Sequence, residues 1–307
     1  MFRNILLWAS ENTWMKKHIP DMYFTRKAVK RFMPGEELSD ALDSAQLFRE
    51  QGIGTVFTYL GENIASLAEA ETVTEHYISA IEEIGKHELI TEISLKLTQI
   101  GLDYSFDEAL QNFFCIARAA RQKDSLVWID MEGSSYTEIT LNFFEKVRGK
   151  LPNVGLCIQA YLDRTESDLH KIFQRPAHIR LVKGAYRESP AVALSRKSQV
   201  DENYLRLAQL LLEKSAESNG RIVFATHDMS LIDQIQNFAE KDNLAKNRFE
   251  IHMLYGIRSS DVVRLKEEGY LVRILISCGD AWYTWYIRRL AERPANLLFV
   301  LRNIFRR

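Results

Sequence analysis

Two adjacent arginines near the end of the chain, Arg288 and Arg289, follow a cluster of aromatic residues and precede Glu292. Neighbouring side chains on a helix diverge by about 100°, so both guanidinium groups can serve one ligand only along their shared edge. A small carboxylate suits such a pair, because each planar guanidinium can make two parallel hydrogen bonds to it. The aromatic residues between 282 and 286 would add apolar walls for a ring attached to that carboxylate. The alternative is a solvated helix in which the arginines pair with Glu292.

Polar residues also recur where short apolar runs of the sequence end. They are Glu62, Lys96, Asp130, Glu132, Gln159, Lys183, Thr226, His227, Asp228 and Tyr255. A single residue of this kind usually caps a helix or faces water. Their repetition along the chain indicates a polar ligand, because the carboxyl ends of parallel strands gather at one edge.

Lys96 lies in the run SLKL, between Leu95 and Leu97. Strand alternation points its side chain away from both leucines, which in a barrel would be into the mouth. A buried ammonium group is costly without a partner, and Asp130 at the end of the next run is the natural candidate. Lysines in barrels also form Schiff bases with carbonyl substrates, so an aldolase-type reaction stays open on these residues alone.

Two kinds of segment alternate along the chain and would position these side chains. The short apolar runs, predicted as strands, are Thr55–Leu60, Glu92–Leu97, Leu126–Met131, Gly155–Ala160, Ile179–Lys183, Ile222–Thr226, Glu250–Leu254 and Leu271–Leu275. The longer amphipathic stretches, predicted as helices, are Asn63–Lys86, Phe106–Gln122, Thr137–Lys150, Glu166–Phe173, Gln199–Ser218, Leu231–Lys241, Ser259–Glu268 and Ala281–Ala291. This alternation predicts an α/β protein with a closed (β/α)8 TIM barrel. The rival, an open doubly wound sheet, is disfavoured because no G-x-G-x-x-G follows the first strand.

Local signals at helix ends agree with this division. Ser105 and Ser230 are predicted helix caps, and Gly269 suits the left-handed residue that ends a helix. A Pro-Gly pair after Met33 is the clearest break in the pattern. It predicts an N-terminal helical segment over residues 1–34 and a catalytic barrel domain over residues 35–307.

Composition excludes several classes of function. Of the 307 residues, 46% are hydrophobic and 26% charged, the balance of a globular protein with a sizeable core. The 40 basic and 41 acidic residues give a net charge of -1, which offers no general attraction to nucleic acid. Cys115, Cys157 and Cys278 are widely spaced and form no CxxC pair, which predicts a reducing compartment and no metal site.

The sequence shows no segment that would cross a membrane, because its apolar runs fall short of roughly 20 residues. The N-terminus also lacks the apolar centre of a secretion signal, so a cytoplasmic location is expected. Residues 294–307 combine apolar side chains with arginines. That pattern favours a terminal helix packed on the protein, with peripheral contact at the inner face of an anionic membrane as the alternative.

Eight stretches of the chain, in order, resemble the proline dehydrogenases. They are Tyr59–Glu62, Ser94–Leu97, Ile129–Gly133, Gln159–Leu162, Arg180–Tyr186, Ala225–Asp228, Phe249–Ile257 and Arg288–Asn296. The motifs RLVKGAY and RRLAERPAN among them are highly specific. The resemblance implies a distorted (β/α)8 barrel with bound FAD, N-terminal helices and a last helix over the barrel mouth. It also implies oxidation of L-proline to 1-pyrroline-5-carboxylate by hydride transfer to the flavin, the first step of proline catabolism.

The resemblance assigns roles residue by residue. Substrate contacts fall to Lys96, Arg288, Arg289, Leu254, Leu275, Trp285 and Glu62. Cofactor contacts fall to Met131, Gln159, Arg180, Val182, Lys183, Gly184, Ala185, Thr226, His227 and Glu292. Catalytic roles fall to Lys96, Asp130 and Arg180: Asp130 would hold Lys96 or support the flavin, and Arg180 would stabilise the charge of reduced flavin. The arginine pair would clamp the proline carboxylate.

Three positions depart from the family pattern. Leu275 and Trp285 stand where tyrosine is usual, and His252 stands where glutamine is usual. The loss of two hydroxyl groups would make the pocket more apolar and change its volume. The alternative substrate is therefore a modified or related ring such as 4-hydroxyproline, pipecolate or an N-alkyl proline. Plain proline is preferred because Lys96, Leu254 and both arginines are intact; a Schiff-base lyase and a non-catalytic relative are the remaining alternatives.

The resemblance also implies partners. A membrane quinone is the expected electron acceptor. A pyrroline-carboxylate dehydrogenase would be a separate chain, because 307 residues leave no room for a second catalytic domain.

Overall fold

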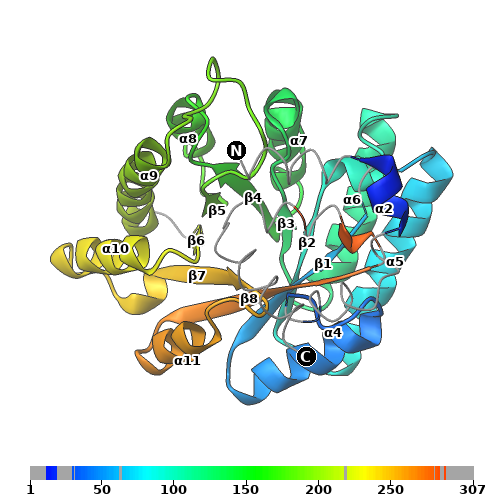
Figure 1. Cartoon of the computed structure of the whole chain (residues 1–307), viewed down its shortest axis with the longest axis horizontal. Coiled ribbons are helices and arrows are strands. Elements are labelled where there is room, and N and C mark those ends of the chain that lie inside the picture. The colour runs from blue at the N-terminus through cyan, green and yellow to red at the C-terminus, as the bar shows by residue number, and fades with distance from the viewer. Residues whose placement is uncertain are drawn as a thin grey trace.

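Eight parallel strands form a closed barrel in the computed structural model of the chain (Figure 1). The structure describes residues 12–18, 30, 32–61, 64–217, 220–279, 281–283 and 287. The strands are β1 (Gly54–Tyr59), β2 (Thr91–Leu95), β3 (Val127–Ile129), β4 (Val154–Gln159), β5 (His178–Val182), β6 (Ile222–Ala225), β7 (Phe249–Leu254) and β8 (Leu271–Cys278). Each strand pairs with the next, and β8 closes the barrel on β1, with Gly54 opposite Arg273 and Tyr59 opposite Cys278. The predicted (β/α)8 barrel is confirmed.

Helices lie around the outside of the strands (Figure 1). The α-helices are α2 (Thr13–His18), α4 (Leu38–Glu50), α5 (Leu67–Lys86), α6 (Phe106–Arg121), α7 (Thr137–Arg148), α8 (Thr165–Ile172), α9 (Lys197–Glu217), α10 (Met229–Lys241) and α11 (Ser259–Glu267). The short 3-10 helices are η1 (Leu97–Ile100), η2 (Ser134–Tyr136) and η3 (Lys246–Arg248).

The helix-end predictions are confirmed at two of three positions. Ser105 caps α6, since its Oγ accepts the Glu108 N–H at 3.2 Å, and Gly269 has the left-handed φ of 92° expected after α11. The cap at Ser230 is wrong. Helix α10 begins at Met229, and the extended residue before it is Asp228. The helix thus begins two residues before Leu231, where the apolar pattern places its start.

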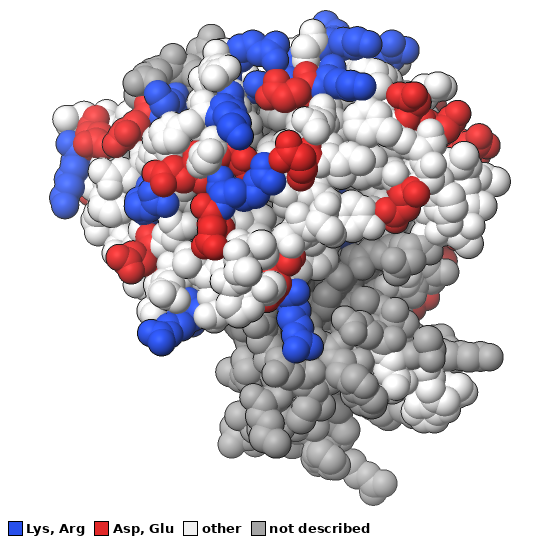
Figure 2. Space-filling model, turned by 90° about the horizontal axis from the view of Figure 1, so that it is seen from above, with Lys and Arg blue, Asp and Glu red and all other residues white. Residues whose placement is uncertain are grey.

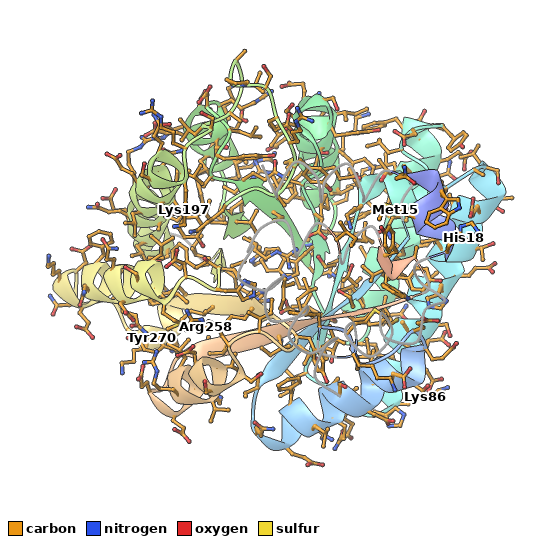
Figure 3. The ribbon with its side chains drawn as sticks, viewed as in Figure 1. Met15, His18, Lys86, Lys197, Arg258 and Tyr270 are labelled. Carbon is orange, nitrogen blue, oxygen red and sulfur yellow. The ribbon has the colours of Figure 1, made fainter. Side chains whose placement is uncertain are left out.

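The barrel wall separates two apolar regions. Strand residues alternate between its faces, so every second side chain packs outward against helices and the others point inward. Outward residues such as Ile93 and Leu95 are fully buried beneath α5 and α6 in one large core. The inner apolar cluster is small and consists of Val56, Leu126, Trp128 and Val223, with Leu275 packed against it. Side chains therefore fill the centre of the barrel (Figure 3).

A layer of paired charges closes the barrel at the end where its strands begin. Arg221 donates to Glu92 at 2.6 Å and to both oxygens of Glu250 at 2.6 and 2.8 Å. Arg273 reaches the same two carboxylates at 3.2 and 3.1 Å. Burial would raise the pKa of Glu250, but hydrogen bonds from His252 and Arg221 hold it well below its usual range. Glu250 is therefore ionised, and both carboxylates depend on the two arginines for their hydrogen bonds.

Replacing Arg221 with methionine is expected to lower the free energy of unfolding by about 3 kcal/mol, because two buried carboxylates lose a partner. Urea unfolding measures the change. Arg206→Met is the matched control, because Arg206 pairs with Glu166 on the surface. That variant should cost less than about 1 kcal/mol. Equal losses of unfolding free energy in the two variants would contradict the claim that the buried charges stabilise the barrel more than a surface ion pair does.

Residues just before α4 contact residues at and after the end of β8. The Glu36 carboxylate accepts the Trp282 indole N–H at 2.9 Å, and the Glu36 carbonyl accepts the Gly279 N–H at 2.8 Å. These bonds tie the residues before α4 to the end of β8. The division at residue 34 stays a prediction. Of the predicted helix Ala281–Ala291, the described residues are 281–283 and 287.

Candidate functional site

Arg180 forms the centre of a charged cluster inside the barrel. It lies in the middle of β5, is 2% exposed, and places its guanidinium carbon 5.0 Å from the centroid of the Trp128 ring. Its Nη2 donates to Ser94 Oγ at 2.7 Å and to Asp130 Oδ1. Ser94 Oγ also donates to Asp130 Oδ1 at 2.9 Å, which completes a triangle across β2, β3 and β5. Arg180 is one of the cofactor residues that the resemblance assigns, and strand alternation turns its side chain inward in the middle of β5.

The triangle holds the positively charged guanidinium of Arg180 where it is shielded from water. Burial alone would lower the pKa of Arg180, but the Asp130 carboxylate and the nearby Cys157 sulfur raise it above its usual value. The burial of an ion pair is tolerated only when its hydrogen bonds are made, and here Ser94 supplies the third contact. The proposed pairing of Asp130 with Lys96 stays a prediction.

Three buried polar atoms near this cluster have no nitrogen or oxygen partner in the described part of the chain. They are Arg180 Nη1, Gln159 Oε1 and His252 Nδ1. Gln159 ends β4 and uses its other amide atom to donate to the Met131 carbonyl at 3.3 Å. Burial lowers the pKa of His252 to about 4, against the opposing effect of Glu250, so the ring is neutral at pH 7. Such atoms are costly when left without partners, which indicates a polar ligand inside the barrel mouth.

Gly184, which follows β5, lies close to Tyr161, which follows the neighbouring strand β4. Its φ is 107°, and a Cβ built on it would lie 2.2 Å from Cδ1 of the Tyr161 ring. Tyr161 in turn donates its N–H to the Lys183 carbonyl at 3.0 Å. Only glycine fits this position, because the Tyr161 ring occupies the place that a Cβ would take.

Lys183 takes part in an ion-pair group at the same rim. Its Nζ lies 2.5 Å from Asp201 and 3.0 Å from Asp228, and Lys197 pairs with the same two carboxylates. Lys197 stands at the start of α9 and is labelled in Figure 3. Burial would raise the pKa of Asp228, but the two lysines hold it below its usual value. Any cofactor contact of the Lys183 side chain must therefore share it with two carboxylates.

His227 and Leu254 are brought together by one hydrogen bond. The Leu254 N–H donates to His227 Nε2 at 2.9 Å, so in the neutral ring the proton is on Nδ1. Thr226 is buried beside them, and its Oγ accepts the Asp228 N–H at 3.2 Å. A predicted substrate residue and two predicted cofactor residues thus share one edge of the barrel mouth.

Lys96 directly follows β2 and is half-buried. Two residues of the adjoining helix η1 make hydrogen bonds that were not predicted from the sequence. Thr98 donates to Glu132, and Gln99 donates to the backbone just after β1. Leu275 is partly buried and packs against the inner apolar cluster of the barrel. The predicted site residues Glu62, Trp285, Arg288, Arg289 and Glu292 lie outside the described residues.

Ser94, Gln99 and Trp128 are site residues that sequence reasoning missed. Ser94 stands two positions before Lys96, so strand alternation places both on the inner face and could have identified it. Trp128 has the same relation to Asp130. For Gln99 no such signal exists, because its partners are backbone carbonyls of another strand.

The remaining surface is mixed in charge. Basic and acidic side chains are interspersed over the face seen in Figure 2. Within the described ranges, no helix is both long and apolar enough to span a bilayer. The same ranges contain no group of three or more His, Cys, Asp or Glu residues placed to hold a metal ion.

Comparisons with known proteins identify the family. A model described as proline dehydrogenase matches residues 41–302. Proline dehydrogenase 1 of Bacillus subtilis (strain 168) is 37% identical over the full length of both chains, and the proline dehydrogenase of Deinococcus radiodurans is 33% identical over 91% of this chain and 90% of that one. The structure of proline utilization A from Bdellovibrio bacteriovorus, inactivated by N-propargylglycine, superposes with a TM-score of 0.80 and 24% identity. It covers 95% of this chain, which spans 36% of that one, and supports the fold.

The resemblance first seen in RLVKGAY and RRLAERPAN is thus confirmed by the whole length of the sequence. With a family match over most of the barrel and full-length relatives above 30% identity, the chain belongs to the proline dehydrogenase family.

Proposed function

We propose that this chain oxidises L-proline to 1-pyrroline-5-carboxylate with bound FAD as the first electron acceptor, the first step of proline catabolism. The observation that carries the proposal is the buried triangle of Arg180, Asp130 and Ser94, beside polar atoms that lack a partner among the described residues. A barrel of this fold builds its site at this end of the strands.

The residues present fit a flavin ring. Gln159 Oε1 and Arg180 Nη1 could take the polar edge of the ring, and the Gly184 backbone permits close approach. Thr226, His227, Val182, Lys183, Ala185, Met131 and Glu292 are proposed to hold the rest of the cofactor. Bound FAD would supply the two-electron acceptor. Arg180 contributes a preorganised positive charge where negative charge would develop on reduction.

The substrate would be held by residues of three elements. Arg288 and Arg289 are proposed to clamp its carboxylate, with Glu62 pairing to Arg288, and Lys96 to lie beside it. Leu254 would line the apolar wall, together with Leu275 and Trp285. Asp130 accepts hydrogen bonds from Arg180 and Ser94. We therefore assign Asp130 to holding Arg180 rather than to taking the proton of the amine.

The test is a visible spectrum of the FAD-supplied protein before and after L-proline is added without oxygen. The expected result is a yellow protein whose flavin band bleaches. A folded protein that stays colourless with FAD contradicts the cofactor, and a yellow protein that proline does not bleach contradicts the substrate. Parallel additions of 4-hydroxyproline and pipecolate test the alternative ring, which the leucine at position 275 suggests because it changes the volume and polarity of a pocket where tyrosine is usual. If either compound bleaches the flavin faster than proline does, that compound replaces proline as the proposed substrate.

Partners and location follow from the same proposal. Electrons would pass from the flavin to a membrane quinone, and a separate pyrroline-carboxylate dehydrogenase would take the product. A cytoplasmic chain with peripheral membrane contact through residues 294–307 suits such an acceptor. Those residues lie outside the described part of the chain.

A further inference from the structure

Gln99 is a fully buried amide that joins the ends of two strands. Its Nε2 donates to the Tyr59 carbonyl at 2.8 Å and to the Gly61 carbonyl at 2.6 Å, both at the end of β1. Its Oε1 accepts the backbone N–H of Lys96 at 3.0 Å, at the end of β2. The Tyr77 hydroxyl lies 3.4 Å from the same oxygen. The exposed fraction of Gln99 is 0%.

A second contact holds the same turn from the other side. Thr98 donates its N–H to Glu132 Oε2 at 3.3 Å and its hydroxyl to Glu132 Oε1 at 2.6 Å. Thr98 and Glu132 are 6% and 7% exposed, so water competes little for these bonds. Helix η1 is therefore anchored to the end of β1 through Gln99 and to the loop after β3 through Glu132.

Lys96 is the residue at which the chain leaves β2 and enters η1. Its backbone is extended, with φ −99° and ψ 141°, and its N–H is the group that Gln99 accepts. The direction of the Lys96 side chain follows from this turn, because Cα and Cβ are fixed once the backbone is held. An apolar side chain could fill the space of Gln99, but it would hold neither carbonyl nor the Lys96 N–H.

We propose that Gln99, supported by the Thr98–Glu132 contact, is a positioning residue that sets the direction of Lys96 toward the substrate. The inference rests on the proposed place of Lys96 beside proline. No charged group is needed in this role. The Gln99 amide donates two hydrogen bonds through Nε2 and accepts one through Oε1. A carboxylate of equal size can only accept.

The decisive variant is Gln99→Glu in the flavin-loaded enzyme. It keeps the volume but cannot donate to the two carbonyls, so Lys96 should shift and kcat/KM for proline should fall on the order of tenfold to a hundredfold. The loss should appear mainly in KM. Gln122→Glu adds the same charge at an exposed position after α6 and should change neither constant. An unchanged KM in the folded, flavin-loaded Gln99→Glu enzyme would overturn the proposal.

A double-mutant cycle with Lys96→Met separates positioning from general support of the fold. If Gln99 acts through Lys96, Gln99→Glu should cause little further loss of kcat/KM once the lysine is gone. Losses that multiply independently would overturn the inference. Normal kinetics of Lys96→Met alone would instead remove Lys96 from the site, and with it part of the proposed function.

Thr98→Val keeps the experiment informative if Gln99→Glu does not fold. Valine matches the shape of threonine and keeps the backbone N–H bond to Glu132, but it loses the hydroxyl that donates to Glu132 Oε1. We expect a smaller rise in KM, of about threefold to tenfold as for one lost hydrogen bond, again absent in the Lys96→Met background. A fall in melting temperature with an unchanged KM would show a structural role only and overturn the proposal.

Discussion

Replacing Arg180 with methionine is expected to lower kcat for proline by about two to three orders of magnitude. The guanidinium is 2% exposed, so its charge acts in a medium of low polarity where its interaction with a developing negative charge is strong. Methionine retains the packing over Trp128 but supplies no charge and no donor. Turnover with a dye acceptor, corrected for flavin content, measures the effect.

The control for this prediction is Arg180→Lys. An ammonium group keeps the positive charge, but its single nitrogen cannot occupy the positions of both Nη2, which contacts Ser94 and Asp130, and Nη1, so an intermediate loss is expected. The assignment of Arg180 to charge stabilisation fails if Arg180→Met keeps its kcat and only its melting temperature falls. It also fails if the lysine and methionine variants lose activity equally at full flavin content.

The barrel could be predicted from the sequence because each unit carries its own signal. Runs such as Ile179–Lys183 and the amphipathic stretch that follows it repeat throughout the chain, and eight repeats of this kind favour closure into a barrel over an open sheet. Strand ends then predict where the candidate site lies, since the fold gathers them at one rim. Local pattern and overall architecture agree here, which is why the prediction held.

The ionic layer at the other end of the barrel could not be predicted. Glu92 and Arg221 are 129 positions apart, and their contact depends on how β2 and β6 face each other across the barrel. Alternation indicates that Glu92 and Glu250 point inward but not which bases they meet. The depth of Arg180 in the barrel could not be predicted for the same reason. Arg180, in the middle of β5, reaches Asp130 after the end of β3 because both side chains point into the closed barrel.

Gly184→Ala is expected to weaken FAD binding on the order of a hundredfold and to lower the melting temperature. The φ of 107° is a conformation that residues with a Cβ rarely adopt, and it costs about 1–3 kcal/mol. The new methyl group would also lie 2.2 Å from Cδ1 of the Tyr161 ring, which is 6% exposed and has little room to move. Together these effects amount to about 3 kcal/mol, the equivalent of that hundredfold change. Titration of the apoprotein with FAD measures it.

Gly149→Ala is the matched control for this prediction. Gly149 ends α7 with a φ of −71°, and a Cβ there would meet its nearest neighbour at an ordinary 3.8 Å. Alanine should therefore be neutral or slightly stabilising at this position, with FAD affinity unchanged. If Gly184→Ala bound FAD as tightly as Gly149→Ala, the close approach of the backbone at Gly184 would not serve the cofactor. Its glycine would then be explained by the packing of Tyr161 alone.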